Sequence, residues 1–149
     1  MTRFAAVAMM AVALVGCGGD TGEQSQDAAP EEEAAAAPGT VTIVEPADGA
    51  ELDAGPVRVV MEVSGLEIVA AGNMDPGTGH HHLVVNGDVD WALPIPNDEG
   101  VHYHMGTAEP EFPLTDRAPG EHRIIAVVAD GVHIPLDPPV SDTITVVIR

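Results

Sequence analysis

Five of the seven histidines in this sequence lie in two short segments, and they are the residues best suited to chemistry. These are His80, His81 and His82 in the first segment and His102 and His104 in the second. Imidazole nitrogen is a good ligand for zinc, copper and nickel ions. Repeated histidines at this spacing therefore predict a site for a transition metal.

The spacing matters because both segments have the composition of β-strands. Residues i and i+2 of a strand project from the same face, about 6.5–7 Å apart. His80 and His82 then share one face, as do His102 and His104. If the two strands are neighbours in matched register, the four imidazoles converge on one ion. We predict a copper or zinc site made of these four residues, with His133 as a further ligand.

Two other interpretations of the histidine pairs stay open. They would also fit a buried network that braces long loops, or exposed residues that titrate near pH 6.5. His81 is expected to point away from His80 and His82 and to be a hydrogen-bonded core residue. His122 follows a Pro-Gly turn and is expected to be structural, with a hydrogen bond to a loop carbonyl.

The sequence contains no familiar catalytic motif. It has no Gly-x-Ser-x-Gly elbow, no phosphate-binding loop and no His-Glu-x-x-His pattern. Carboxylates are plentiful, but no spacing marks an acid–base pair. We therefore predict a binding protein and not an enzyme.

The start of the chain predicts export and lipid attachment. Arg3 precedes an apolar run over residues 4–15, which is too short for a mature membrane span and is typical of a secretory signal. Leu14-Val15-Gly16-Cys17 resembles the bacterial lipobox, in which the cysteine is acylated and becomes the new N-terminus. We predict a lipoprotein signal peptide over residues 1–16 and lipidation of Cys17, with the protein anchored outside the cytoplasm. Gly18 favours the outer membrane in a cell with two membranes.

The acidic composition of the chain limits the kinds of partner that it can bind. Residues 17–39 form an acidic, polar segment without core-forming side chains, and we predict a disordered tether. Loss of the signal would remove Arg3 and no acid, which lowers the formal net charge from −19 to −20. This negative charge repels phosphate backbones and therefore excludes nucleic acid as a partner, whereas it attracts cations. The charge is also explained if it only keeps the protein soluble. With Cys17 acylated, no thiol remains for a disulfide or a metal.

Residues 40–149 must form the domain that positions the histidines. Short apolar runs separated by Gly/Pro turns predict an all-β domain, an immunoglobulin-like β-sandwich of seven to eight strands. The runs lie at 40–45, 57–63, 66–70, 80–85, 101–105, 111–114, 122–129 and 140–148. The long loop 88–100 carries Trp91, the single tryptophan, which is the natural contact residue if the domain is an envelope interaction module with structural histidines.

Several motifs resemble a known bacterial family. They are Gly79-His80-His81-His82-Leu83, Pro119-Gly120-Glu121-His122 and the ending His133-Ile134-Pro135-Leu136-Asp137-Pro138-Pro139-Val140. In this order they resemble domain-of-unknown-function family 4399, over roughly residues 41–148. The resemblance implies a secreted or lipid-anchored β domain. A weaker likeness, through Pro46-Ala47-Asp48-Gly49-Ala50, is to periplasmic copper-carrier domains of the CopC type.

Overall fold

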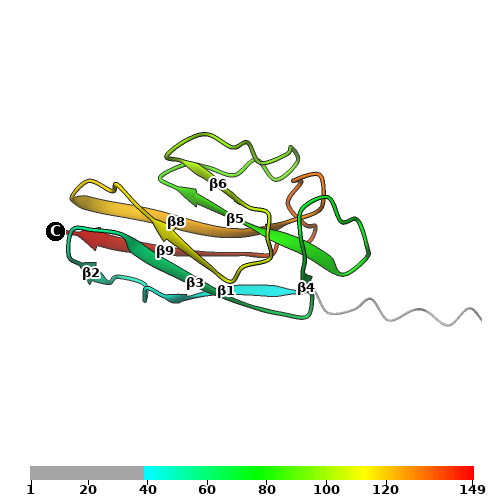
Figure 1. The fold of residues 1–149 in the computed structure, drawn as a ribbon, viewed down its shortest axis with the longest axis horizontal. Coiled ribbons are helices and arrows are strands. Elements are labelled where there is room, and N and C mark those ends of the chain that lie inside the picture. Colours follow the sequence, from blue (N-terminus) through cyan, green and yellow to red (C-terminus); the bar gives the residue numbers. More distant parts are fainter. Residues whose placement is uncertain (1–38) are drawn as a thin grey trace, which may run out of the picture. The chain divides into compact units, whose positions relative to one another are not determined.

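Two β-sheets packed face to face make up the part of the chain described by the computed structural model, residues 39–149 (Figure 1). The predicted signal peptide and Cys17 lie outside the described residues, as does the predicted tether up to residue 38. Residues 39–149 contain no helix long and apolar enough to cross a membrane.

The smaller sheet has three strands in the order β1-β3-β7, all antiparallel. They are β1 (Thr40–Glu45), β3 (Val57–Ser64) and β7 (Glu111–Leu114). Alternation of apolar and polar side chains makes these segments strands with one buried face. In β3, for example, Val57, Val59 and Met61 are buried, whereas Arg58 and Glu62 are exposed.

The larger sheet has six strands and contains the histidine segments. Its order is β2-β9-β8-β5-β4, and β6 also pairs with β5. The strands are β2 (Glu51–Leu52), β4 (Glu67–Ile68), β5 (Thr78–Val85), β6 (His102–Met105), β8 (Gly120–Ala129) and β9 (Ser141–Ile148). The pairs β2–β9 and β4–β5 are parallel, and the others are antiparallel.

The main core fills the space between the sheets. It is built from Val, Ile, Leu, Met and Ala side chains of both sheets, such as Val59 of β3, Leu83 of β5 and Ile124 of β8. A second, small cluster lies on the other face of the larger sheet, where Ile95 of the β5–β6 connection packs on Val127 and Ala129 of β8. The connection therefore covers part of a sheet face that would otherwise meet water.

The predicted all-β sandwich is confirmed. The pattern at residues 111–114 matches β7, and most other strand limits agree within one or two residues. β2 has only two residues and was not predicted, because so short a segment shows no alternation. The third predicted strand, 66–70, is shorter in the structure, where β4 covers Glu67–Ile68.

Candidate metal centre

The register of β5 places His80 and His82 on the outer face of the larger sheet. On β5, side chains alternate, so Leu83 and Val85 enter the main core while His80, His82 and Val84 point the other way. His82 lies opposite His104 on β6 and opposite Val127 on β8. His80 and His82 are only 1% exposed, because loops cover this face.

His133 reaches the same place from the connection between β8 and β9. A compact turn holds it: Asp130 Oδ1 accepts hydrogen bonds from the backbone amides of Val132 and Ile134, both 2.9 Å long. The backbone of His133 has a φ of 72°, a left-handed conformation that is strained for a residue with a side chain. Its carbonyl accepts a 2.8 Å hydrogen bond from Ile95, which ties the two covering loops together.

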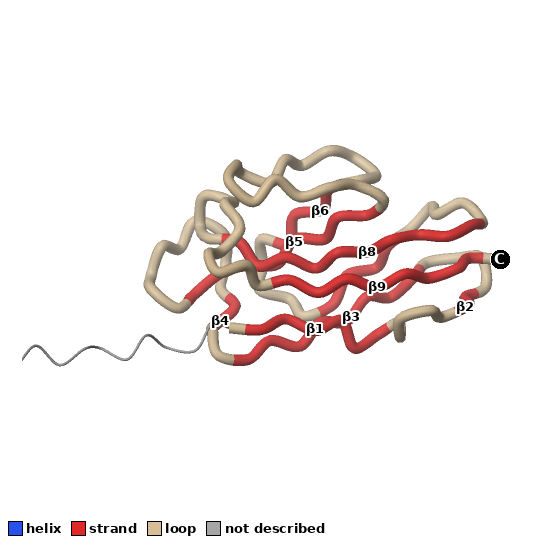
Figure 2. Tube along the Cα trace, turned by 180° about the vertical axis from the view of Figure 1, so that it is seen from behind, coloured by secondary structure: helices blue, strands red, loops and turns tan. Residues whose placement is uncertain are grey.

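Three connections meet at this end of the larger sheet, as Figure 2 shows in tan. The loop before β5 joins the loop after β8 through the Gly72 amide, which donates a 3.1 Å hydrogen bond to the Gly131 carbonyl. A methyl group on Gly131 would lie 2.2 Å from the backbone oxygen of Asn73, so only glycine allows this approach. The position of His133 therefore depends on packed backbone on two sides.

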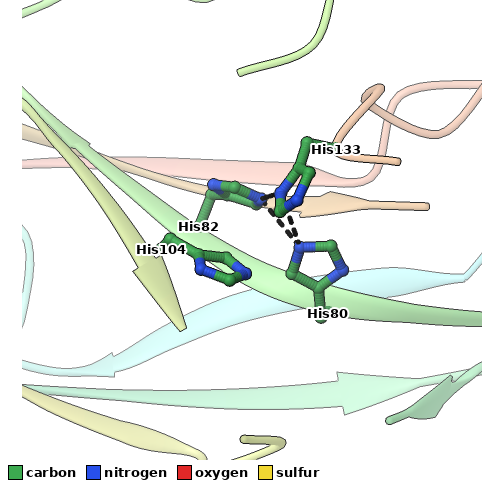
Figure 3. Close-up of side chains that lie close together, drawn as sticks. All are labelled: His80, His82, His104 and His133. Carbon is green, nitrogen blue, oxygen red and sulfur yellow. Dashed lines mark hydrogen bonds between the residues drawn. The ribbon is translucent and has the colours of Figure 1, made fainter. Parts of the chain in front are cut away.

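Four histidines converge there: His80, His82, His104 and His133 (Figure 3). One ligand nitrogen from each lies within 4.8 Å of those of the other three. Three nitrogens are closer still: His80 Nε2 lies 2.9 Å from His82 Nε2, and His133 Nδ1 lies 3.3 Å from each of them. Such a set of imidazole nitrogens has the size of the ligand shell of a small metal ion.

Hydrogen bonding within the cluster cannot satisfy all three close contacts. A hydrogen bond joins a nitrogen that carries a proton to one that offers a lone pair. Among three nitrogens in mutual contact, at least two must be of the same kind, so at most two of the three contacts are hydrogen bonds. Three lone pairs directed at one cation would remove this conflict.

The cluster strongly disfavours protonation. Burial, followed by the neighbouring His133 and His104, lowers the pKa of His80 to about 4. Burial and then His80, His104 and His133 lower the pKa of His82 to about 3. The pKa of His104 is also lowered, by burial and then by His133. At neutral pH these rings are uncharged and offer the lone pairs that a metal requires.

Two further features surround His104, the fourth histidine of the cluster. Its Nε2 atom is buried and has no hydrogen-bond partner in the described structure. Gly106 packs against the ring, since a methyl group there would lie 2.7 Å from His104 Cε1. Unpartnered buried nitrogens cost stability and are a reason to look for a ligand.

His102 lies outside the cluster, contrary to the expectation that it would join His104. In the observed register it is opposite Val84, and its ring points to the loop. Its Nε2 lies 3.4 Å from the carbonyl oxygen of Asp88, and its Nδ1 lies 3.3 Å from a carboxylate oxygen of Asp98. The register places His102 two residue pairs beyond His82, so the structure brings together four of the five predicted ligands.

The two histidines expected to be structural lie outside the cluster, but only His122 is hydrogen-bonded as expected, since the buried Nδ1 of His81 has no hydrogen-bond partner within residues 39–149. His81 is 2% exposed and lies on the core face of β5, between Met105 of β6 and Val128 of β8. Burial lowers its pKa to about 4. His122 donates a 2.8 Å hydrogen bond from Nε2 to the carbonyl of Ala118 and accepts one of 3.0 Å at Nδ1 from Asn86.

Sequence reasoning missed two residues that shape the site. One is Asp130, although an Asp-Gly pair just before His133 is a signal for side-chain hydrogen bonds to the following amides. The other is Gly106, which follows the second histidine segment directly. Its close contact with the ring of His104 can be recognised only in the three-dimensional structure. Trp91 is 44% exposed on the β5–β6 connection and takes no part in the cluster.

Comparisons with known proteins identify a family without an assigned activity. The family model described as "Domain of unknown function (DUF4399)" matches residues 59–149. No curated protein matches the chain. A crystal structure of an engineered protein at 1.98 Å resolution is similar at 18% identity and a TM-score of 0.43, over 77% of this chain and 21% of the other. The chain therefore spans about a fifth of that protein's length.

Proposed function

This chain belongs to the family described as Domain of unknown function (DUF4399), and we propose that its domain binds a transition-metal ion, copper or zinc, in the cell envelope. The ligands are His80, His82, His104 and His133. The role is that of a metal carrier, buffer or sensor and involves no catalysis.

The observation that carries the proposal is the mutual approach of His80 Nε2, His82 Nε2 and His133 Nδ1. Their separations are 2.9, 3.3 and 3.3 Å. Zinc–nitrogen bonds of about 2.0–2.1 Å at tetrahedral angles place neighbouring nitrogens about 3.3–3.4 Å apart. The three nitrogens are thus spaced for one ion, whereas a purely hydrogen-bonded network leaves one contact unsatisfied.

Calorimetric titration of the full-length chain, purified in detergent, with Zn²⁺ and Cu²⁺ tests the proposal. We expect one ion to bind per chain. The variants His82→Ala and His104→Ala should each lose at least tenfold in affinity. His102→Ala is the matched control, because it removes a histidine from the same strand as His104 but from outside the cluster. Equal affinities in His104→Ala and His102→Ala would refute the site.

The proposed location rests on the sequence motif at Cys17. An acylated cysteine followed by an acidic tether would hold the domain at the membrane surface and outside the cytoplasm, on the outer membrane in a cell with two membranes. Metabolic labelling with palmitate should mark the wild-type protein and not Cys17→Ser. A labelled Cys17→Ser protein would contradict lipidation at this residue.

A second candidate function is supported by exposed apolar side chains on the loops around the cluster. Trp91 and Leu93 are 44% and 58% exposed on the β5–β6 connection, and Val132 is 51% exposed beside His133. Exposed large side chains of this kind favour contact with an envelope protein. In this alternative the histidines brace the loops. Cross-linking in cells, compared between wild type and Trp91→Ala, tests it: an unchanged set of cross-linked proteins would argue against a contact through Trp91.

A further inference from the structure

The four histidine rings are arranged as a tetrahedron. The six distances between their ring centroids are 4.8, 5.1, 5.0, 5.2, 5.4 and 4.7 Å. Four points with six nearly equal separations lie at the corners of a tetrahedron. In a square-planar arrangement two of the six distances would exceed the other four by a factor of about 1.4.

The three close nitrogens lead to the same result independently. Any three corners of a square include one diagonal, and for metal–nitrogen bonds near 2.0 Å that diagonal is about 4 Å. The three nitrogens of His80, His82 and His133 are separated by 2.9, 3.3 and 3.3 Å, so none of these pairs is a diagonal. The three atoms instead form one face of a tetrahedron.

From this geometry we infer that the site is specific for zinc, in the sense that it favours Zn²⁺ over Cu²⁺ relative to an unconstrained set of imidazoles. This rests on the proposed function and names its metal. Zn²⁺ accepts tetrahedral imidazole ligands without electronic penalty, whereas Cu²⁺ prefers tetragonal coordination. Cu⁺ prefers thiolate and thioether ligands, and the ligand set here is made of imidazoles alone.

The protein elements around the rings oppose a change to planar coordination. His80 and His82 are held on a strand paired on both sides, and the turn of Asp130 fixes His133. Gly106 packs against the ring of His104. One ring nitrogen of His104 already lies within 4.8 Å of the ligand nitrogens of the other three histidines, so only a small movement is needed to bind the same ion. Bringing the four ligand nitrogens into one plane would require movement of packed backbone. In addition, four protein ligands leave no open coordination position for a substrate. The site is thus built to hold zinc and not to activate water.

Cobalt substitution tests the inference, because Co²⁺ occupies zinc sites and its visible spectrum reports coordination. The full-length chain loaded with Co²⁺ should show the intense visible bands of tetrahedral Co²⁺, and one equivalent of Zn²⁺ should abolish them. His102→Ala should give the same spectrum. In competition, the ratio of Zn²⁺ to Cu²⁺ affinity should be at least tenfold higher than for a hexahistidine peptide.

The outcomes separate this inference from the proposed function. Weak bands of six-coordinate Co²⁺, or a Zn²⁺ to Cu²⁺ affinity ratio equal to that of the peptide, would overturn zinc specificity while the site itself stood. If neither Zn²⁺, Cu²⁺ nor Co²⁺ bound at all, the proposed function would fail and the inference with it.

Discussion

Replacing Gly106 by alanine should weaken metal binding although it removes no ligand. The added methyl group would lie 2.7 Å from Cε1 and 3.1 Å from Nε2 of His104. Carbon atoms pack at about 3.5–4.0 Å, so the ring must move by roughly 0.8 Å or more. Gly106 does not have a positive φ, so alanine can adopt the same backbone conformation.

The size of the effect follows from the tolerance of a metal–ligand bond. Ligand distances in metal sites hold to within about 0.2 Å, which is much less than the required movement of His104. Disturbing the support of one ligand usually costs about 10–100-fold in metal affinity. At free metal concentrations far above the dissociation constant, the same loss lowers metal-linked stabilisation by about 1.4–2.7 kcal/mol.

Urea denaturation of the wild type and the variant, each with a chelator and with excess Zn²⁺, measures this difference directly. The matched control is Gly87→Ala, whose methyl group would crowd Val101 Cγ1 at 2.6 Å and lie 3.8 Å from His102 Nε2, outside the cluster. Gly87→Ala should lose the same stability with and without zinc. If Gly106→Ala folded and kept the full zinc-linked stabilisation, the assignment of His104 as a ligand would be refuted.

Substitutions at three other positions separate the roles of the remaining residues. In the metal-free protein, the pKa of His81 is about 4 when folded and near 6.5 when unfolded, so the unfolded chain binds more protons as the pH falls. The free energy of unfolding should therefore drop by about 3 kcal/mol between pH 7 and pH 4 because of His81 alone. Urea denaturation of His81→Leu should show that this part of the pH dependence is removed. If the free energy of unfolding of His81→Leu changed with pH as steeply as that of the wild type, a buried neutral ring would be contradicted. Asp130→Ala leaves two amide donors of the turn that holds His133 without an acceptor, and it should lower the zinc affinity measured by calorimetry about tenfold. Asp130→Asn keeps an acceptor oxygen and should lower the zinc affinity less. Equal losses of zinc affinity in the two variants would instead implicate the charge of Asp130. His122→Leu should cost about 1–3 kcal/mol in urea denaturation because it leaves Asn86 and Ala118 without their partner, and a change in its zinc affinity would show that the residue is more than structural.

The fold was predictable because side-chain alternation and turn residues are local signals. Val57, Val59 and Met61 of β3 alternate with polar residues, and this pattern predicts a strand with one buried face. β5 is different, since it is buried on both faces. The outer face of β5 is covered by connections that contain Ile95 and His133, and no local pattern shows where a loop will settle. The burial of His80 and His82 therefore needed the tertiary structure.

The ligand set depended on strand register, which the sequence does not determine. A shift by two residues between β5 and β6 would have placed His102 opposite His82; the observed pairing places His104 there. In the observed register His102 lies opposite Val84, on the same sheet face as His80, His82 and His104 but outside the cluster.

In the structure, His133, which was predicted as a further ligand, completes the cluster without His102 and approaches from a loop that covers the sheet. Three ligands from one sheet face and a fourth from above it enclose a volume, and the nearly equal ring separations follow from this arrangement. The sequence predicted copper or zinc and five ligands, and the structure removes His102 from that set and keeps His133. Because His133 is held by Asp130 and by Ile95, the proposed preference for zinc over copper would reside in the loops, while the two strands supply the base of the site.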